Sequence, residues 1–179
     1  TLEAEGIDTS RILRTRNEQT GCYLAIEDET GEMAMAVSDT RALQHMADED
    51  LATAAAGNLD ANWWFLDANL TPAMLDVLVK MDNRPAVAVD AVSVSKVVRL
   101  RDRLAEFSLV FCNREEAEAL FEQKFASTLE AGQAMAAEAV ASVVTDGPRP
   151  LCIQSGQDIQ QIKVPPTEVV SVNGAGDAL

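Results

Sequence analysis

Short apolar runs alternate with longer amphipathic stretches over most of the chain, and the two spacings predict different secondary structures. Compact apolar runs rich in Val, Ile and aromatic residues indicate buried strands, whereas apolar residues three or four positions apart indicate helices. Asp48 and the pair Thr71-Pro72 provide helix-start signals, as an N-cap and as a cap followed by proline. The pattern predicts helices at 48–56, 71–81, 96–104, 115–121 and 128–141, and strands at 62–67, 85–90, 108–112, 142–145, 151–154 and 169–172.

The first part of the chain has a different pattern, made almost entirely of strands and turns. It predicts a helix end over 1–7 closed by Gly6, strands at 12–14, 21–26 and 32–37, and a turn at 28–31. The change of pattern places a boundary between about residues 38 and 47. We therefore expect residues 1–44 to form a partial N-terminal β region, and residues 45–179 to form an α/β core. In that core, strands alternating with helices predict a doubly wound, mainly parallel sheet flanked by helices.

Polar residues stand where several of the predicted strands end. Asp67 and Asp90 each close an apolar strand, Asn113 follows another, and Thr145-Asp146-Gly147 follows a fourth. The carboxyl ends of parallel strands share one edge of a sheet, so these groups are expected to converge on one crevice. The alternative is that these residues only form turns, for which Asp, Asn and Gly are common choices.

The last nine residues, Ser171 to Leu179, carry an apolar run into Gly-Ala-Gly and a carboxylate. Gly174 and Gly176 allow a sharp turn and a close approach of the backbone to a bound group. The unpaired N–H groups at a helix start would make this turn an anion site, with Asp177 placed to accept a proton. The alternative is an ordinary strand-to-helix turn in which Asp177 only stabilises the helix start.

Asn113 and Glu116 also allow two interpretations. Asn113 can cap the helix that follows, with Glu115 and Glu116 in its electropositive first turn. Alternatively, Asn113 and Glu116 face the crevice and organise magnesium-bound water, since magnesium prefers oxygen ligands and retains several waters.

Composition excludes several classes of function. A formal charge of −15 argues against nucleic-acid and anionic-membrane partners, which require basic surfaces. Cys22, Cys112 and Cys152 are odd in number and lie in apolar runs, which indicates reduced core thiols and a cytoplasmic location. With His45 as the one histidine, no Cys/His metal cluster is expected, and no apolar run is long enough to span a membrane.

Three motifs resemble those of the ribokinase-like (PfkB) family of sugar and nucleoside kinases. Gly174-Ala175-Gly176-Asp177 matches its C-terminal signature, Asn113 and Glu116 match its Asn-x-x-Glu motif, and Thr145-Asp146-Gly147 is similar to its Val-Thr-x-Gly turn. The sequence departs from the signature at Ser171, Val172, Asn173 and Leu179. The resemblance implies a ribokinase-like fold, with ATP and Mg²⁺ as cofactors.

The first half extends this resemblance. Residues 20–25 and 28–32 are similar to the family's lid strands, so a small β lid is expected. The stretch 89–96, with Ala36 to Asp39, resembles the family's pseudouridine kinases, although an exposed helix start would explain Ser93, Ser95 and Lys96 equally well.

By this resemblance, Asp177 would be the catalytic base, and the N–H groups after Gly174 would stabilise the transferring phosphoryl group. Asn113 and Glu116 would hold magnesium through water, and Thr145 and Gly147 would line the nucleotide. The substrate candidates are Thr20, Asp39, Asp90 and Lys96.

The function implied is phosphorylation of a ribose 5′-hydroxyl, with pseudouridine as the leading substrate. Another sugar or nucleoside, or a non-catalytic nucleoside-binding module, remains open. A monovalent cation such as K⁺ and a homodimer formed through the lid also remain open. The chain opens on Thr1 and ends two residues after Asp177, so we expect an internal segment of a longer protein that is inactive in isolation.

Overall fold

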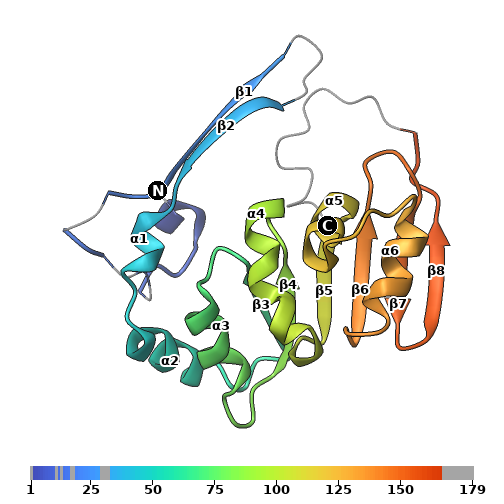
Figure 1. The fold of residues 1–179 in the computed structure, drawn as a ribbon. Coiled ribbons are helices and arrows are strands. Elements are labelled where there is room, and N and C mark those ends of the chain that lie inside the picture. The colour runs from blue at the N-terminus through green and yellow to red at the C-terminus, as the bar shows by residue number, and fades with distance from the viewer. Residues whose placement is uncertain (1, 11, 13, 17–18, 29–32, 167–179) are drawn as a thin grey trace.

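The computed structural model describes residues 2–10, 12, 14–16, 19–28 and 33–166, and within them two separate sheets (Figure 1). Strands β1 (Cys22–Glu27) and β2 (Met33–Asp39) pair antiparallel as a two-stranded sheet. The other six strands form one mixed sheet. They are β3 (Trp63–Asp67), β4 (Ala86–Asp90), β5 (Leu109–Asn113), β6 (Ala141–Thr145), β7 (Leu151–Ser155) and β8 (Asp158–Ile162).

The six strands lie side by side in chain order. Strands β3 to β6 pair in parallel, whereas β7 and β8 each run antiparallel to the strand before them. The predicted α/β class and mainly parallel sheet are therefore confirmed. Strand β8 was not predicted, because its sequence Asp-Ile-Gln-Gln-Ile has no apolar run. It forms because Gly156, at φ +55°, makes the tight turn after β7.

The helices largely follow the prediction, with differences at their ends. Thr71 caps α3 by accepting a hydrogen bond from the Met74 N–H at 3.3 Å, with Pro72 in the first turn as predicted. Asp48 is not a cap: Ala47 holds that position, and Asp48 lies in the first turn, where its charge suits the helix dipole. The helices are η1 (Leu2–Glu5), α1 (Arg41–Gln44), α2 (Asp48–Ala56), α3 (Pro72–Val79), α4 (Val94–Val97), η2 (Val98–Glu106), α5 (Arg114–Phe121) and α6 (Thr128–Met135).

Two predicted helices are shorter or tighter than expected. The segment 96–104 divides into the single turn α4 and the 3₁₀ helix η2, which together bury Val97, Leu100 and Leu104. Helix α6 ends at Met135 and not at residue 141, because the chain turns back toward β6 through i→i+3 bonds such as Met135 C=O to Glu138 N–H at 3.0 Å. Tertiary geometry here overrides the helix preference of an alanine-rich segment.

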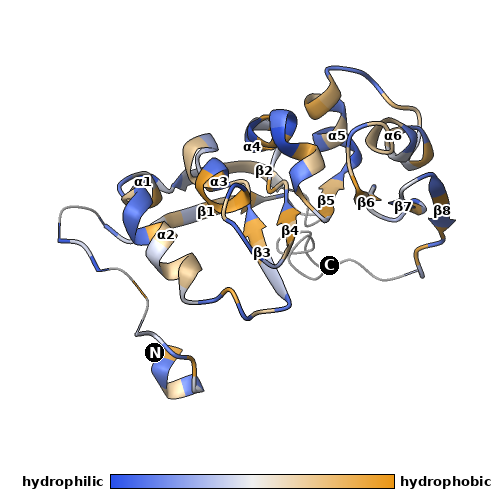
Figure 2. Cartoon of the chain, turned by 90° about the horizontal axis from the view of Figure 1, so that it is seen from below, coloured by the Kyte–Doolittle hydropathy of each residue, from blue (hydrophilic) through white to orange (hydrophobic). Residues whose placement is uncertain are grey.

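The helices that connect the strands lie on one face of the six-stranded sheet (Figures 1 and 2). Side chains that point toward these helices, including Val87, Val110 and Val144, are fully buried. The opposite face carries Trp63 and Phe65, which are 54% and 67% exposed. Among the described residues, helices therefore cover one face of the sheet, whereas the predicted doubly wound arrangement has helices on both.

The N-terminal part and the cysteines differ in detail from the prediction. Residues 2–5 form a 3₁₀ turn followed by Gly6 at φ +77°, and residues 12 and 14 of the predicted strand 12–14 are not in a strand. Cys112 and Cys152 are buried free thiols, as predicted, but Cys22 is exposed because the hairpin that carries it is not packed into the core.

One close contact fixes α6 on the sheet. A methyl group on Gly132 would overlap the Sγ atom of Cys152, which is fully buried on β7. We expect Gly132→Ala to lower the free energy of unfolding by about 1–2 kcal/mol, because overpacking outweighs the gain of roughly 1 kcal/mol in helix propensity. Urea denaturation measures this change.

The matched control removes the obstructing sulfur. In a Cys152→Ala background, Gly132→Ala should be neutral or stabilising, since the methyl group then fills vacated space. A single Gly132→Ala variant as stable as the wild type would contradict this account of the contact.

Candidate active site

The polar residues at the strand ends lie along one edge of the six-stranded sheet. In the ladders, Asp67 is opposite Asp90, and Asn113 is opposite Thr145. Asp90 is opposite Phe111, two residues before Asn113, so the middle strands connect the two pairs. Because opposed residues point to the same face, all four side chains project from the face that carries Phe65 and Phe111. The fold therefore places these four residues along one edge and on one face of the sheet, as predicted. Their predicted convergence with Asp177 on one crevice stays a prediction, because Asp177 lies outside the described residues.

Asp67 and Asp90 form local turn bonds at this edge. The Asp67 carboxylate accepts two hydrogen bonds from Asn69, one from the backbone N–H at 2.8 Å and one from the side-chain amide at 3.0 Å. Asp90 accepts a bond from the Val92 N–H at 2.7 Å. The turn-forming role that sequence allowed for these residues is therefore present. Val92 has φ +66°, an unusual conformation for a β-branched residue, directly beside the candidate site.

Lys96 lies near the same edge, in α4. Its Nζ donates a hydrogen bond to the Asn69 side-chain oxygen at 2.5 Å. Arg99, one turn later, donates to the carbonyl groups of Ala68 and Asn69, both at 2.9 Å. These bonds fix the loop after β3 to α4 and η2, and they place the Lys96 amino group beside the Asp67 turn.

Asn113 and Glu116 form a reciprocal capping box at the start of α5. The Asn113 side chain accepts a bond from the Glu116 N–H, and the Glu116 carboxylate accepts one from the Asn113 N–H, both at 2.8 Å. The predicted cap is confirmed. Glu116 is buried, 6% exposed, whereas Asn113 is exposed and open to a ligand.

Burial also sets the charge preference of Glu116. Burial of the Glu116 carboxyl away from solvent raises its pKa. The hydrogen bond from the Asn113 N–H lowers this pKa, whereas the negative charges of Asp90 and Glu115 raise it further. Burial raises the pKa of the Cys112 thiol as well, and the nearby charges of Glu116 and Asp90 raise it further. The edge of the sheet at β4 and β5 therefore carries a concentration of negative charge, and a cation bound there would stabilise the ionised carboxylates.

The turn after β6 contains Gly147 at φ +56°, a backbone conformation that favours glycine. A methyl group added there would meet no atom within 4 Å, so the turn is open to solvent. The Asp146 carbonyl accepts a hydrogen bond from the Arg149 N–H at 3.1 Å, which closes the turn.

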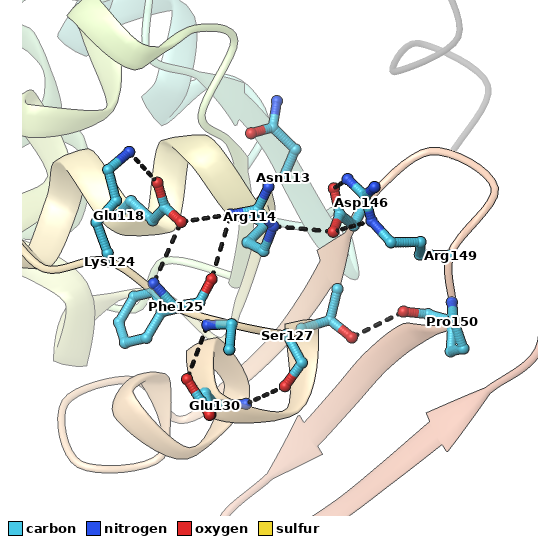
Figure 3. A network of polar contacts seen from close by, with 12 residues as sticks. Asn113, Arg114, Glu118, Lys124, Phe125, Ser127, Glu130, Asp146, Arg149 and Pro150 are labelled. Carbon is cyan, nitrogen blue, oxygen red and sulfur yellow. Dashed lines mark hydrogen bonds and ion pairs between the residues drawn. The ribbon is translucent and has the colours of Figure 1, made fainter.

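A network of charged side chains holds this turn against α5 (Figure 3). Arg114 Nε donates to an Asp146 carboxylate oxygen at 2.8 Å, and Arg149 donates to the same carboxylate. Arg114 also pairs with the buried Glu118, which Lys124 contacts at 2.6 Å. Sequence reasoning missed the contact of Arg114 with Asp146, because partners 32 residues apart give no local signal.

The lid candidates Thr20 and Asp39 lie at the base of the β1–β2 hairpin. Asp39 is opposite Cys22 in the ladder, and Thr20 precedes Cys22 by two residues. Asp39 pairs with Arg41 at 2.7 Å, and the hydrogen bond from the Arg41 side chain lowers the pKa of Asp39 to about 2. Asp39 is therefore ionised and already paired at neutral pH.

The C-terminal motif lies outside the described residues. This applies to Gly174, Ala175, Gly176 and Asp177 and to the predicted strand 169–172. Over the described part of the chain, no group of three or more His, Cys, Asp or Glu side chains is arranged to hold a metal ion directly. Within that same part, the helices are all too short or too polar to cross a membrane.

Comparison with known proteins adds independent information. The model of the "pfkB family carbohydrate kinase" matches residues 1–179. A pseudouridine kinase of Escherichia coli (strain K12) is 29% identical over 187 residues, which cover 97% of this chain and 57% of that protein. The chain thus spans little more than half the length of this curated relative.

Solved structures show the same fold. A carbohydrate kinase from Agrobacterium tumefaciens superposes with a TM-score of 0.72 at 24% identity, over 92% of this chain and 54% of that one. A putative ribokinase II from E. coli gives 0.78 at 15% identity, over 98% and 60%. Adenosine kinase from Schistosoma mansoni, in complex with 2-fluoroadenosine, gives 0.74 at 16% identity, over 92% and 55%.

These similarities confirm the ribokinase-like α/β fold expected from the motifs. The family match extends from the β1–β2 hairpin through the strand ends to the Gly-Ala-Gly-Asp motif. The chain belongs to the pfkB family of carbohydrate kinases.

Proposed function

We propose that the full-length protein is an ATP-dependent kinase that phosphorylates the 5′-hydroxyl of a ribose-containing substrate, converting pseudouridine to pseudouridine 5′-phosphate. The observation that carries this proposal is the alignment of Asp90, Asn113 and Thr145 along one sheet edge in a chain of this family. The likeness to the E. coli pseudouridine kinase supports the choice of substrate.

The residues have complementary roles in this proposal. Asp177 accepts the proton of the attacking hydroxyl, while the N–H groups of Ala175, Gly176 and Asp177 stabilise charge on the phosphoryl group in transit. Gly174 allows the backbone to approach the phosphate. Thr145 and Gly147 line the nucleotide, a role supported by the open, glycine-dependent turn after β6.

Magnesium is the cation that suits the electronegative edge near Asn113 and Glu116. Buried Glu116 beside Asp90 offers hard carboxylate oxygens, and its raised pKa indicates that a cation nearby would stabilise the ionised form. With no direct cluster of metal ligands among the described residues, contact through water is the mode that fits. The cation would neutralise charge on the transferring phosphates. A monovalent ion such as K⁺ is a further expectation from the family resemblance.

The hairpin would act as the lid over the substrate. Thr20 and Asp39 at its base, with Asp90 and Lys96 at the sheet edge, are the residues proposed to contact the nucleoside. The hairpin exposes apolar side chains, including Leu24 at 65% and Val37 at 61%, which supports a homodimer formed through the lid. Lid closure would exclude water and limit ATP hydrolysis.

A substrate panel tests the proposed function. With ATP and Mg²⁺, the full-length protein should phosphorylate pseudouridine with a kcat/KM at least about tenfold above that for uridine, a difference of roughly 1.4 kcal/mol in transition-state binding. Uridine is the matched control, because it has the same ribose and differs in the glycosidic bond. Adenosine, ribose and fructose 6-phosphate complete the panel. Good turnover of one of these without pseudouridine would contradict the substrate, and no turnover of any would favour a binding module.

A further inference from the structure

The turns after β5 and β6 contain two of the motifs that the proposed function assigns to ATP. The backbone ladder between these strands ends at the pair Asn113–Thr145. The residues that directly follow these two strands are Arg114, the first residue of α5, and Asp146. The Arg114 Nε and Asp146 Oδ2 atoms are 2.8 Å apart. The ion pair therefore continues the connection between the two turns beyond the end of the sheet (Figure 3).

This ion pair is more enclosed than an ordinary surface pair. The side chains of Arg114 and Asp146 are 21% and 11% exposed. Arg114 is also held by Glu118, which is 6% exposed, and by the Phe125 carbonyl at 3.2 Å. A guanidinium group with several fixed partners has one preferred position, so its contact with Asp146 defines the spacing of the two turns.

Arg149 contacts the same carboxylate but has a different place in the structure. Its side chain is 63% exposed, and its sequence distance from Asp146 is three residues, within the same turn. It therefore contributes charge beside Asp146, and its interaction with α5 is the electrostatic attraction of exposed Glu115, which is weaker than the ion pair that Arg114 forms with Asp146. The hydrogen bonds from Arg149 and from Arg114 lower the pKa of Asp146, while burial acts in the opposite direction. Asp146 is ionised at neutral pH and can bind both cations.

We propose that Arg114 and Asp146 are a positioning pair for the nucleoside triphosphate. Their ion pair sets the distance between the Asn113–Glu116 turn and the Thr145–Gly147 turn, between which the phosphates and magnesium would be bound. The inference rests on the proposed function, since it needs ATP at these turns. Arg114 and Asp146 stand at the variable positions of the two motifs. In this proposal they determine the affinity for the nucleotide and leave the acceptor site unaffected.

The test compares Arg114→Gln, Asp146→Asn and Arg149→Gln in the full-length protein. Calorimetric titration with ATP and Mg²⁺ gives the nucleotide Kd, and initial rates give the KM for the acceptor. We expect Arg114→Gln and Asp146→Asn each to weaken ATP binding about tenfold, because a small displacement of positioning groups is costly. The acceptor KM should change less than about twofold. The double variant should lose no more ATP affinity than either single variant.

Arg149→Gln is the matched control, as it also removes one cation beside Asp146, and it should change ATP affinity less than about twofold. The positioning role would be overturned if Arg149→Gln lost as much ATP affinity as Arg114→Gln. It would also be overturned if Arg114→Gln lost ATP and acceptor affinity equally, or if Arg114→Gln and Asp146→Asn left ATP affinity unchanged. If Arg114→Gln fails to fold, the nearly isosteric Asp146→Asn gives the answer. A wild-type protein that binds no ATP would instead overturn the proposed function, and the inference with it.

Discussion

Replacing Asp177 by Ala in the full-length protein is expected to lower kcat by about 10³-fold, the middle of the range for a general base. The proposed base takes the proton only as the hydroxyl attacks, so the KM values for ATP and acceptor should change little. Steady-state kinetics over both substrate concentrations measure the two effects separately. Asp177→Asn, which preserves shape, should be almost as impaired.

The alternative of a non-catalytic binding module makes the opposite prediction. In such a module, Asp177→Ala would leave ligand affinity and any slow background turnover nearly unchanged. Titration of ATP into the Asp177→Ala protein is the control, and affinity near that of the wild type is expected. Full activity in the variant would exclude Asp177 as the base.

Replacing Glu116 by Gln is expected to lower kcat/KM by roughly 10- to 100-fold, as loss of an outer partner of a bound metal usually does. Gln at the third helical position still accepts the Asn113 N–H, so the capping box should survive. Higher magnesium concentrations should restore part of the activity. Assays over a magnesium series measure this restoration.

The stability of the Glu116→Gln variant should change in the other direction. Burial raises the pKa of Glu116 above its ordinary value of 4.5, so the folded state binds the proton more tightly than the unfolded chain does. The protonated Glu116 carboxyl therefore contributes its full stabilisation of the folded state below pH 4.5. This contribution is lost as the pH rises through the pKa of Glu116 in the folded protein. Glu116→Gln should therefore equal or exceed the wild type in free energy of unfolding at pH 7.

Glu115→Gln is the matched control for both effects. It removes the same charge from the same helical turn, but Glu115 is exposed and outside the capping box. Its activity should lie within about twofold of the wild type, because an exposed charge contributes little. Equal loss of activity in Glu115→Gln and Glu116→Gln would show that general charge near the helix start, and not a magnesium role, explains the result.

The sequence predicted those features whose cause is local. The apolar runs around Val87 and Val110 specify buried strands in any α/β context, and their polar final residues then lie on one edge. Thr71-Pro72 and the Asn113–Glu116 box are short-range signals for helix starts, and both occur in the structure as predicted.

Features that depend on distant contacts were missed or misjudged. The polar strand β8 depends on pairing with β7, and the end of α6 depends on where β6 must begin. The ion pair of Arg114 with Asp146 joins charges that only the folded sheet brings together. The N-cap of α2 was misjudged by one residue: Asp48 is a common capping residue, but it lies in the acidic first turn with Glu49 and Asp50, and Ala47 is the cap.

The most direct test of the account is a crystal structure of the full-length protein with magnesium and a non-hydrolysable ATP analogue. We predict that the γ-phosphate lies between the turns that bear Asn113 and Thr145, with the Asp177 carboxylate facing it from the side of the acceptor hydroxyl. An analogue bound away from these turns, or Asp177 on a different side of the fold, would contradict the proposed kinase mechanism.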